Sequence, residues 1–247
     1  MSLFKRKHKD NFDTDVPKIV IGRKNGKSES YNRLKDNIIY GSDSGNKKVF
    51  QIESSISGEG KSTIATNLAV ALVKSGKKVL VLDLDFRRPK MHRAFAIPNF
   101  NGLAEYMLGE SKREDLIKHT EYGVDVINRG KAAQNASIIF TSSKFKALIE
   151  ELREIYDIIL FDCPPVLLVS DYMHISKLSD EVIFVVSAGV THRSQLKEAV
   201  ELLKQNNVKI FGVVMTYHNS GKFGVKYGGY YNGRYYKGVK NRYISEK

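Results

Sequence analysis

A short stretch in the first quarter of the chain joins an apolar run, a loop of small residues and the start of a helix. Its sequence, over residues 49–64, is VFQIESSISGEGKSTI. β-Favouring side chains come first, serines and glycines follow, and Lys61, Ser62 and Thr63 lead into a helical pattern from Ile64 onward. A loop with few Cβ atoms lets successive backbone N–H groups converge on phosphate oxygens, and the helix dipole adds to the attraction. The stretch therefore predicts a strand, a phosphate-binding loop and a helix, arranged as a nucleotide site.

The residues of this loop have distinct predicted roles. Lys61 is expected to reach the β- and γ-phosphates, and the Ser62 hydroxyl is expected to ligate Mg²⁺. The residues predicted to bind the nucleotide are Ser57, Gly58, Glu59, Gly60, Lys61, Ser62 and Thr63. The pattern G-x-x-x-x-G-K-[ST] is broken at its first position, where Ser55 replaces glycine. The alternative interpretation is an ordinary glycine-rich turn that caps a helix.

Composition limits the class of protein. The 247 residues suit one large α/β domain, and the single cysteine, Cys163, excludes an internal disulfide and suits a reducing cytosol. No apolar run reaches the ~20 residues of a membrane-spanning helix, and the basic N-terminus lacks the apolar stretch of a signal peptide. We therefore expect a soluble, cytoplasmic chain. The net charge of +13 requires an acidic partner, which could be anionic lipid, nucleic acid or an acidic protein.

Apolar, β-branched runs alternate with helical patterns along most of the sequence. Such runs are typical of a parallel sheet covered by helices on both faces, so we predict an α/β, P-loop NTPase-like fold with a mostly parallel sheet. Helices are expected at residues 29–40, 102–119, 144–156 and 191–207, with a loop at 41–46 and another helix between the phosphate loop and Gly76. Further strands are expected at residues 77–89, 124–127, 157–161, 181–187 and 208–215.

The composition divides the chain into three regions. Residues 1–16 form a basic N-terminal arm, residues 17–221 form the single folded domain, and residues 222–247 form a tail rich in Tyr, Gly, Lys and Arg. Because the tail has no hydrophobic period, it cannot bury enough surface to offset its ordering entropy, and we expect it to be flexible. The tail contains six of the 13 tyrosines: Tyr227, Tyr230, Tyr231, Tyr235, Tyr236 and Tyr243.

Two of the predicted strands finish in carboxylates. Ligands of open α/β sheets bind at the carboxyl ends of strands, where Asp83, Asp85 and Asp162 are expected to lie. Asp162 suits a Walker-B role of holding Mg²⁺. Asp83 and Asp85 face the same side if the strand stays extended, so that one can orient Mg²⁺ while the other accepts the proton of the attacking hydroxyl. The alternative for Asp85 is that it caps the following turn, and Cys163 is expected to be a small buried residue, not a nucleophile.

Three motifs together resemble the bacterial tyrosine kinases of the capsular or exopolysaccharide type, in their cytoplasmic form. SSISGEGKST is similar to their Walker A motif, VLVLDLDFRRPKMH to Walker A′, and ILFDCPPVLLVSD to Walker B. The tyrosine cluster of the tail is a fourth shared feature. By motif position, Lys61, Ser62, Asp83, Asp85 and Asp162 are then implied to hold the nucleotide and Mg²⁺ and to carry the catalysis.

The resemblance also implies an activity, cofactors and partners. It implies an ATP- and Mg²⁺-dependent kinase that autophosphorylates the six tail tyrosines in trans, between protomers of a ring, and regulates polysaccharide synthesis and export. It further implies a membrane-spanning adaptor that activates the kinase, a cognate tyrosine phosphatase, and a location at the inner face of the cell membrane through the adaptor. Nucleic acid is not an expected partner.

The sequence departs from this family at several positions. The ring-forming helix pattern E-x-x-R-x-x-R aligns with Glu29, Asn32 and Lys35, so both arginines are missing. Asparagine cannot form a bidentate pair with a carboxylate and lysine is only a point charge, so the predicted ring is weakened. The usual proline-rich segment is reduced to residues 131–135, and Cys163 replaces threonine.

Two other functions compete with the kinase interpretation. A partitioning or septum-positioning ATPase shares the fold and switches on a membrane or DNA surface. Such ATPases carry a signature lysine in the phosphate loop, where this chain has Ser57. A nucleic-acid-binding protein could instead use the Tyr/Arg tail for base stacking and phosphate contacts.

Overall fold

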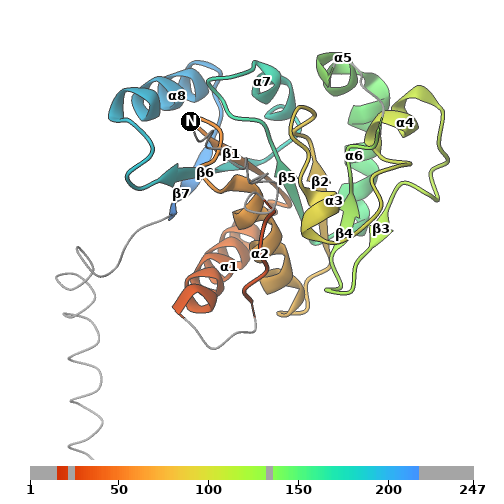
Figure 1. The fold of residues 1–247 in the computed structure, drawn as a ribbon, viewed down its shortest axis with the longest axis horizontal. Helices are drawn as coiled ribbons and strands as arrows, with labels where there is room; N and C mark the ends of the chain where they lie inside the picture. Colours follow the sequence, from red (N-terminus) through yellow and green to blue (C-terminus); the bar gives the residue numbers. More distant parts are fainter. Residues whose placement is uncertain (1–15, 22–25, 132–135, 217–247) are drawn as a thin grey trace, which may run out of the picture.

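The computed structural model describes residues 16–21, 26–131 and 136–216, which form a sheet between two layers of helices (Figure 1). The seven strands lie in the order β3-β4-β2-β5-β1-β6-β7. Their bounds are β1 Val49–Ser54, β2 Val79–Asp83, β3 Lys118–His119, β4 Asp125–Ile127, β5 Ile158–Asp162, β6 Glu181–Ser187 and β7 Ile210–Thr216. All neighbouring strands are parallel except β3 and β4, which are antiparallel, so the predicted, mostly parallel α/β sheet is confirmed.

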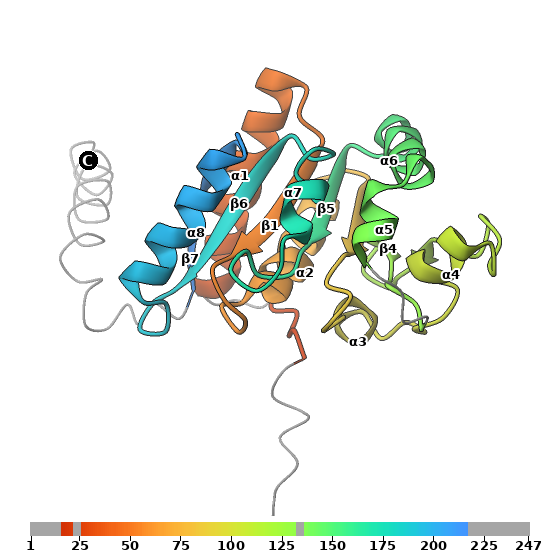
Figure 2. The ribbon, with the colours of Figure 1, turned by 90° about the horizontal axis from the view of Figure 1, so that it is seen from above.

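Helices cover both faces of the sheet, as Figure 2 shows from above. One face packs on α1 Gly26–Gly45, α2 Lys61–Val73 and α3 Met91–Ala94. The other face packs on α4 Leu103–Leu108, α5 Ala136–Thr141, α6 Ser143–Ile155, α7 Asp171–Ile175 and α8 Arg193–Gln205. Within the described residues, every helix is too short or too polar to cross a membrane.

The central strands are buried along their whole length because each has a helix layer on both sides. All residues of β1, β2 and β5 are buried, with side chains alternating between the two layers. On β1, Phe50 and Ile52 pack against α2, while Val49 packs against the α6 side. At about 25 cal/mol per Å² of apolar surface, this burial is the main stabilising term of the fold.

The first helix differs from its prediction. It runs from Gly26 to Gly45, so the expected helix at 29–40 was too short, and the expected loop at 41–46 is wrong because the helix continues to Gly45. Packing explains the extension: a Cβ on Gly41 would come within 2.5 Å of the Phe211 ring of β7, so glycine is what lets helix and strand approach. The helix ends before Asn46, which has a left-handed φ of 50°.

Several other boundaries also needed correction. The helix expected over residues 102–119 ends at Leu108, because Gly109 takes a left-handed φ of 80°, and the region closes with strand β3. Strand β2 ends at Asp83, although an extended run to residue 89 was expected. The short helices α5 and α7 were not predicted. The last strand lies at the sheet edge, where Val213 and Met215 are exposed, so it does not close the core as expected.

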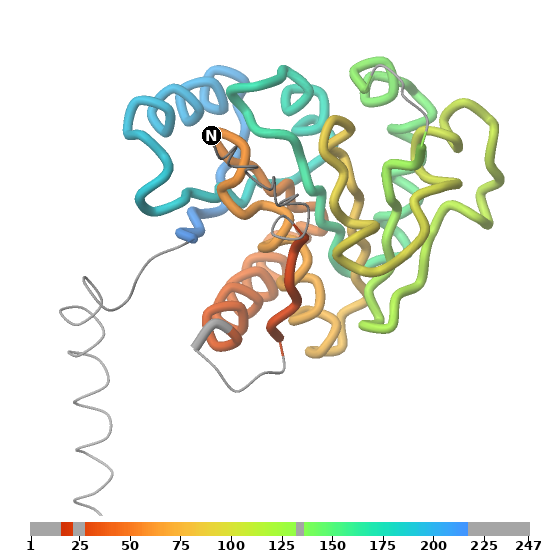
Figure 3. The backbone as a smooth tube through the Cα atoms, in the orientation of Figure 1, coloured from red at the N-terminus to blue at the C-terminus, as the bar shows by residue number. Residues whose placement is uncertain are grey.

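The N-terminal and C-terminal regions are described only in part. In the segment of residues 16–21, Val20 N–H donates to Asn67 Oδ1 at 2.7 Å, so this segment is held beside α2 (Figure 3). The predicted arm, except Val16, and the predicted tail with its six tyrosines lie outside the described residues. Their predicted flexibility therefore stays a prediction.

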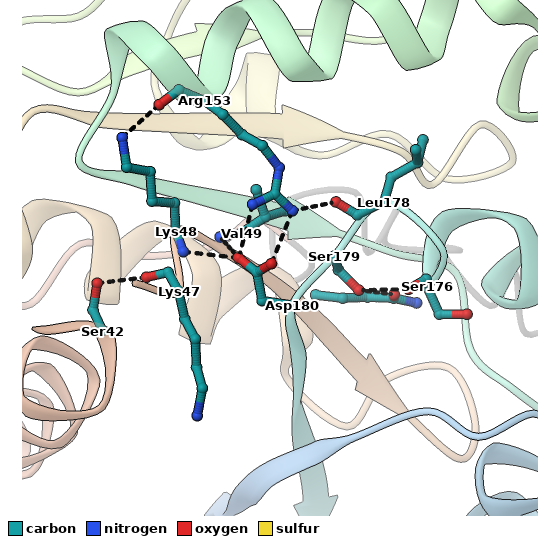
Figure 4. Close-up of polar contacts among 10 residues, drawn as sticks. Ser42, Lys47, Lys48, Val49, Arg153, Ser176, Leu178, Ser179 and Asp180 are labelled. Carbon is teal, nitrogen blue, oxygen red and sulfur yellow. Dashed lines mark hydrogen bonds and ion pairs between the residues drawn. The ribbon is translucent and has the colours of Figure 1, made fainter. Parts of the chain in front are cut away.

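The amino ends of β1 and β6 are joined by one aspartate (Figure 4). Asp180 Oδ2 accepts the N–H groups of Lys48 and Val49, each at 2.8 Å. The Arg153 guanidinium of α6 forms a bidentate pair with Asp180 at 3.0 Å to each oxygen, and also donates to Leu178 O. These bonds fix the start of the strand that carries the phosphate loop.

Candidate active site

The phosphate loop occupies the turn between β1 and α2, as predicted. Gly58 and Gly60 have left-handed φ angles of 86° and 100°, a conformation that other L-residues rarely adopt. A Cβ on Gly58 would meet no atom within 4 Å, so this glycine is required by its backbone conformation, not by crowding. The helix begins at Lys61, three residues before the predicted helical pattern, so its N-terminal amides belong to the loop.

Lys61 is buried and folds back over its own loop. Its Nζ donates to Ser54 Oγ at 2.9 Å, and Ser54 Oγ donates to Ile56 O at 2.8 Å. A small cavity of about 200 Å³ lies beside the loop. It is lined by Ser57, Gly58, Gly60, Lys61, Ser62 and Thr63, together with Val16, Pro17, Asp85, Arg88 and Lys90. The structure thus gathers the predicted loop residues around one cavity, except Glu59, whose side chain is fully buried behind the loop.

Asp83 and Asp162 lie side by side at the carboxyl ends of β2 and β5. They are register partners on adjacent parallel strands, and both are buried. Asp83 Oδ2 accepts the N–H groups of Lys90 and Met91, each at 2.9 Å. Asp83 Oδ1 and both carboxylate oxygens of Asp162 are buried without a hydrogen-bond partner among the described residues. Such orphaned oxygens on neighbouring carboxylates point to a cationic ligand between them.

The electrostatics of this pair follow from burial and proximity. Burial raises the pKa of the Asp162 carboxyl to about 6, although the nearby Lys61 ammonium and the Ser62 hydroxyl oppose the shift. Burial and the neighbouring Asp162 charge raise the pKa of Asp83 well above its usual value, although the Met91 amide opposes this. Two carboxylates in one dry site each disfavour the charge of the other, and a bound cation would relieve both.

Asp85 lies beyond the end of β2, so the extended-strand argument for it is wrong. Its Oδ1 accepts the N–H groups of Arg87 and Arg88 at 3.2 and 3.0 Å, which is the turn cap that the sequence left open as an alternative. The same side chain lines the cavity beside the loop. Asp85 therefore shapes the turn and also faces the space next to Lys61 and Ser62.

Three residues of the site were not found by sequence reasoning. Arg88 and Lys90 line the cavity from the turn after β2, and their basic character within DFRRPK was the available signal. Glu53 is a fully buried carboxylate near the carboxyl end of β1; Gln51 Nε2 donates to one of its oxygens, and the other has no described partner. Burial raises the pKa of Glu53 to about 8, with Gln51 and Lys61 opposing the shift. A charged residue inside an apolar strand was the signal for Glu53.

Cys163 behaves as the small buried residue that was expected. It is 0% exposed, and burial raises the pKa of its thiol well above the usual value, which disfavours the nucleophilic thiolate. Among the described residues, His, Cys, Asp and Glu form no group of three that could hold a metal by themselves. A Mg²⁺ at Asp83 and Asp162 would therefore share its coordination with Ser62, phosphate oxygens and water, as Mg²⁺ commonly does.

The residues fit a magnesium nucleotide on these observations. The loop offers backbone amides and a helix N-terminus, Lys61 offers an ammonium group, and the paired aspartates offer orphaned oxygens.

The ring-helix positions Glu29 and Lys35 lie on α1 and form ion pairs within that helix. Glu29 pairs with Arg33 at 3.7 Å, and Lys35 pairs with Asp36 at 2.8 Å.

Known proteins resemble this chain in both sequence and fold. A family model described as an AAA domain matches residues 47–211. The chain is similar to Tyrosine-protein kinase YwqD of Bacillus subtilis (strain 168), with 36% identity over 76% of this chain and 80% of that protein. The structure is similar to the kinase domain of Escherichia coli tyrosine kinase ETK, with a TM-score of 0.72 and 27% identity over 76% of this chain and 74% of that one.

A more distant similarity reaches the competing class of ATPases. The septum site-determining protein MinD from Pyrococcus horikoshii OT3, complexed with Mg-ADP, has a TM-score of 0.60 and 26% identity. The match covers 71% of this chain and 72% of that one. Its lower TM-score and identity place the septum-positioning interpretation behind the kinase interpretation.

Proposed function

The chain belongs to the bacterial tyrosine kinases, and we propose that its phosphate loop and paired aspartates transfer the γ-phosphoryl group of ATP to protein tyrosines. The observation that carries this proposal is the pair Asp83–Asp162, whose orphaned, buried oxygens lie at the strand ends next to Lys61. A purely structural aspartate pair would have its oxygens hydrogen-bonded.

Each residue has a role that its position supports. The loop amides and Lys61 bind and orient the phosphates, and Ser62, Asp83 and Asp162 hold Mg²⁺, which neutralises charge on the phosphate oxygens. Asp85 lines the cavity, whereas Asp83 is buried and bonded to two backbone amides. Asp85 is therefore better placed to accept the proton of the attacking tyrosine, while Asp83 orients the metal.

The tyrosine acceptors belong to the same proposal. A phenol must reach the γ-phosphate, which requires an exposed hydroxyl on a chain that can move. The tail tyrosines are Tyr227, Tyr230, Tyr231, Tyr235, Tyr236 and Tyr243, whereas Tyr156 and Tyr172 are buried in the core. We propose autophosphorylation of this tail in trans, in an oligomer, and control of polysaccharide synthesis and export through phosphorylation of the tail.

The location of the kinase is proposed from charge and resemblance. A net charge of +13 favours an anionic membrane surface or an acidic protein segment. We propose that a membrane-spanning adaptor recruits and activates the chain at the inner face of the membrane, and that a cognate tyrosine phosphatase reverses the modification.

A lysine pair on one helix provides the test of the active site. Lys61→Met removes the ammonium group from the start of α2, and Lys74→Met removes an exposed one just beyond its end. With ATP and Mg²⁺, phosphotyrosine formation should fall by about 10²-fold or more in Lys61→Met, because the lysine stabilises charge on the transferred phosphoryl group. Mass spectrometry of the full-length protein measures the product, and Lys74→Met should match the unaltered protein.

The acceptor assignment is tested on the same samples. A variant with Phe at all six tail tyrosines should lose the phosphotyrosine signal but still phosphorylate an added copy that carries Lys61→Met. Full activity of a folded Lys61→Met protein would contradict the site. Phosphate found mainly outside residues 227–243 would contradict the tail proposal and leave the site intact.

A further inference from the structure

The phosphate loop contains a carboxylate that does not line the cavity. Glu59 lies between Gly58 and Gly60, and its side chain is fully buried. Its Oε2 accepts the N–H of Ile56 at 2.7 Å, which bonds the two halves of the loop to each other. Kinase chemistry as proposed above gives this buried carboxylate no role.

A threonine from the other side of the site bonds to the same carboxylate. Thr191 Oγ1, in the turn between β6 and α8, donates to Glu59 Oε1. The same hydroxyl accepts the N–H of Ser187, the last residue of β6, at 3.0 Å. Because the hydroxyl is held by the strand end, its one proton is directed at Glu59, and the loop is bonded to β6.

A second threonine bonds to the backbone of Glu59. Thr216, the last residue of β7, donates from Oγ1 to Glu59 O at 2.6 Å. Its own carbonyl accepts the N–H of Ala188 at 3.0 Å, so the two threonines are anchored to neighbouring strands. A Cβ on Gly60 would come within 3.2 Å of Thr216 Cγ2, which shows how closely the strand end approaches the loop.

We propose that Glu59, Thr191 and Thr216 form a clamp that positions the phosphate loop for nucleotide binding. A loop with two left-handed glycines has many unfolded conformations, and only one of them directs its amides at phosphate. Two donors, the Ile56 N–H and the Thr191 hydroxyl, bond to the Glu59 carboxyl group, and a third, the Thr216 hydroxyl, bonds to its backbone carbonyl. Together these hydrogen bonds can select that conformation before the nucleotide arrives. A pre-organised loop binds more tightly because less ordering cost is left for the binding step.

The clamp residues are positioning residues, since none of their side chains lines the cavity. The proposal rests on the proposed nucleotide site. It predicts a specific kinetic pattern: a weaker clamp raises KM for ATP and leaves kcat at saturating ATP nearly unchanged, because the nucleotide itself restores the loop conformation. A residue needed only for folding would lower the melting temperature without changing the affinity of the folded protein.

Mg·ADP is the probe, and isothermal calorimetry on the full-length protein is the measurement. Thr191→Val and Thr216→Val keep the shape of the side chain and remove the hydroxyl. Each should weaken Mg·ADP binding about tenfold, the fold-change that corresponds to the loss of one buried hydrogen bond. Thr191→Ser and Thr216→Ser keep the hydroxyl and should restore the affinity. Thr120→Val is the matched control, because Thr120 Oγ1 is buried without a described hydrogen-bond partner. This variant should bind Mg·ADP with unchanged affinity.

The outcomes separate this proposal from the proposed function. If both valine variants bind Mg·ADP like the unaltered protein while Lys61→Met has lost binding, the clamp is wrong and the nucleotide site stands. If the unaltered protein does not bind Mg·ADP, the nucleotide site fails and the clamp fails with it. Circular dichroism at the temperature of the titration shows that each variant is folded, and the two valine positions provide independent tests.

Discussion

The aspartates at the two ends of the central sheet differ in their hydrogen-bond partners. At the amino ends of β1 and β6, Asp180 receives two backbone amides and a bidentate guanidinium (Figure 4). At the carboxyl ends of β2 and β5, Asp162 has no described hydrogen-bond partner, although it is fully buried. Asp162 is 1% exposed whereas the Asp180 side chain is 24% exposed, so the two sites differ in depth as well as in hydrogen-bonding partners.

The difference between the two aspartates is visible in the pKa of each carboxyl. Burial disfavours the charge of Asp180, but the Arg153 guanidinium and the amides of Val49 and Lys48 outweigh it and lower the pKa of the carboxyl. Asp162 is more deeply buried than Asp180, so burial dominates there and the pKa of its carboxyl rises to about 6. The amino end therefore uses its aspartate to stabilise the fold, whereas the carboxyl end keeps a destabilising carboxylate, which is typical of a functional site.

The largest expected effect is the loss of catalysis when Asp162, at the carboxyl end of the sheet, is changed. Asp162→Asn keeps the size of the side chain and removes a Mg²⁺ ligand, so phosphotyrosine formation should fall by about 10³-fold. Stability of the nucleotide-free protein should stay equal or rise, because a buried, unpaired charge has been removed. Phosphotyrosine assays and thermal unfolding measure both effects. A variant that keeps its activity, or loses stability, would show that Asp162 is structural.

The matching change at the amino end should have the reverse pattern. Asp180→Asn leaves the Arg153 guanidinium partly buried without its carboxylate and weakens two backbone hydrogen bonds, so the free energy of unfolding should fall by about 2 kcal/mol. Activity at a temperature where the variant is folded should be nearly unchanged. Denaturant titration measures the loss.

The control for that variant is another aspartate that caps a strand from an exposed position. Asp157 Oδ2 accepts the N–H of Lys78 at 2.7 Å but is exposed. Asp157→Asn should cost less than about 1 kcal/mol, because water replaces the lost interaction. Equal losses of unfolding free energy in the two variants would mean that burial of the Arg153–Asp180 pair adds nothing to the stability of the fold.

The carboxyl end of the sheet was largely predictable from the sequence. The phosphate loop has a local pattern of residue types, and aspartates that end apolar runs must gather at one edge of a parallel sheet. The sequence therefore predicted that Lys61, Asp83 and Asp162 lie together, and the structure places them together. The helix layers on both faces were likewise implied by continuous apolar strands. What was missed at this end depends on side-chain direction: Glu59 was expected to line the nucleotide, yet it points into the protein, and Arg88 enters the cavity from a turn.

The amino end was not predictable, because its contacts join residues far apart in the sequence. Asp180 lies between a short helix and β6, and nothing in its neighbours indicates that Arg153 and Val49 will meet it. The extension of α1 to Gly45 has the same origin, since the Phe211 ring that favours Gly41 comes from the last strand. Tertiary packing overrode the local signal in both cases.

The pH dependence of stability is the last test of the comparison, because the aspartates at the two ends should act with opposite signs. For Asp180 the folded pKa lies below its ordinary value of 3.8, so its stabilisation is present above that pH and is lost as the pH falls through the folded pKa. For Asp162 the pKa in the folded protein is raised to about 6. The stability that its neutral form contributes is therefore fully present below pH 3.8 and is lost as the pH rises through 6. Each pKa unit corresponds to about 1.4 kcal/mol, so the rise of about 2 units at Asp162 corresponds to a change of about 3 kcal/mol in the free energy of unfolding.

Urea unfolding of the nucleotide-free protein between pH 3 and pH 8 separates these terms. Compared with the unaltered protein, Asp162→Asn should gain stability as the pH rises toward 6, and Asp180→Asn should lose less stability below pH 4, because the titrating group is gone. Glu53→Gln extends the test, since the pKa of Glu53 is raised to about 8 and its removal should matter most between pH 5 and pH 8. Parallel stability curves for the unaltered protein and Asp162→Asn from pH 4 to pH 7 would contradict a buried, unpaired carboxylate at the carboxyl end. They would also remove the contrast with Asp180, because the pKa of Asp162 would then not be raised in the folded protein.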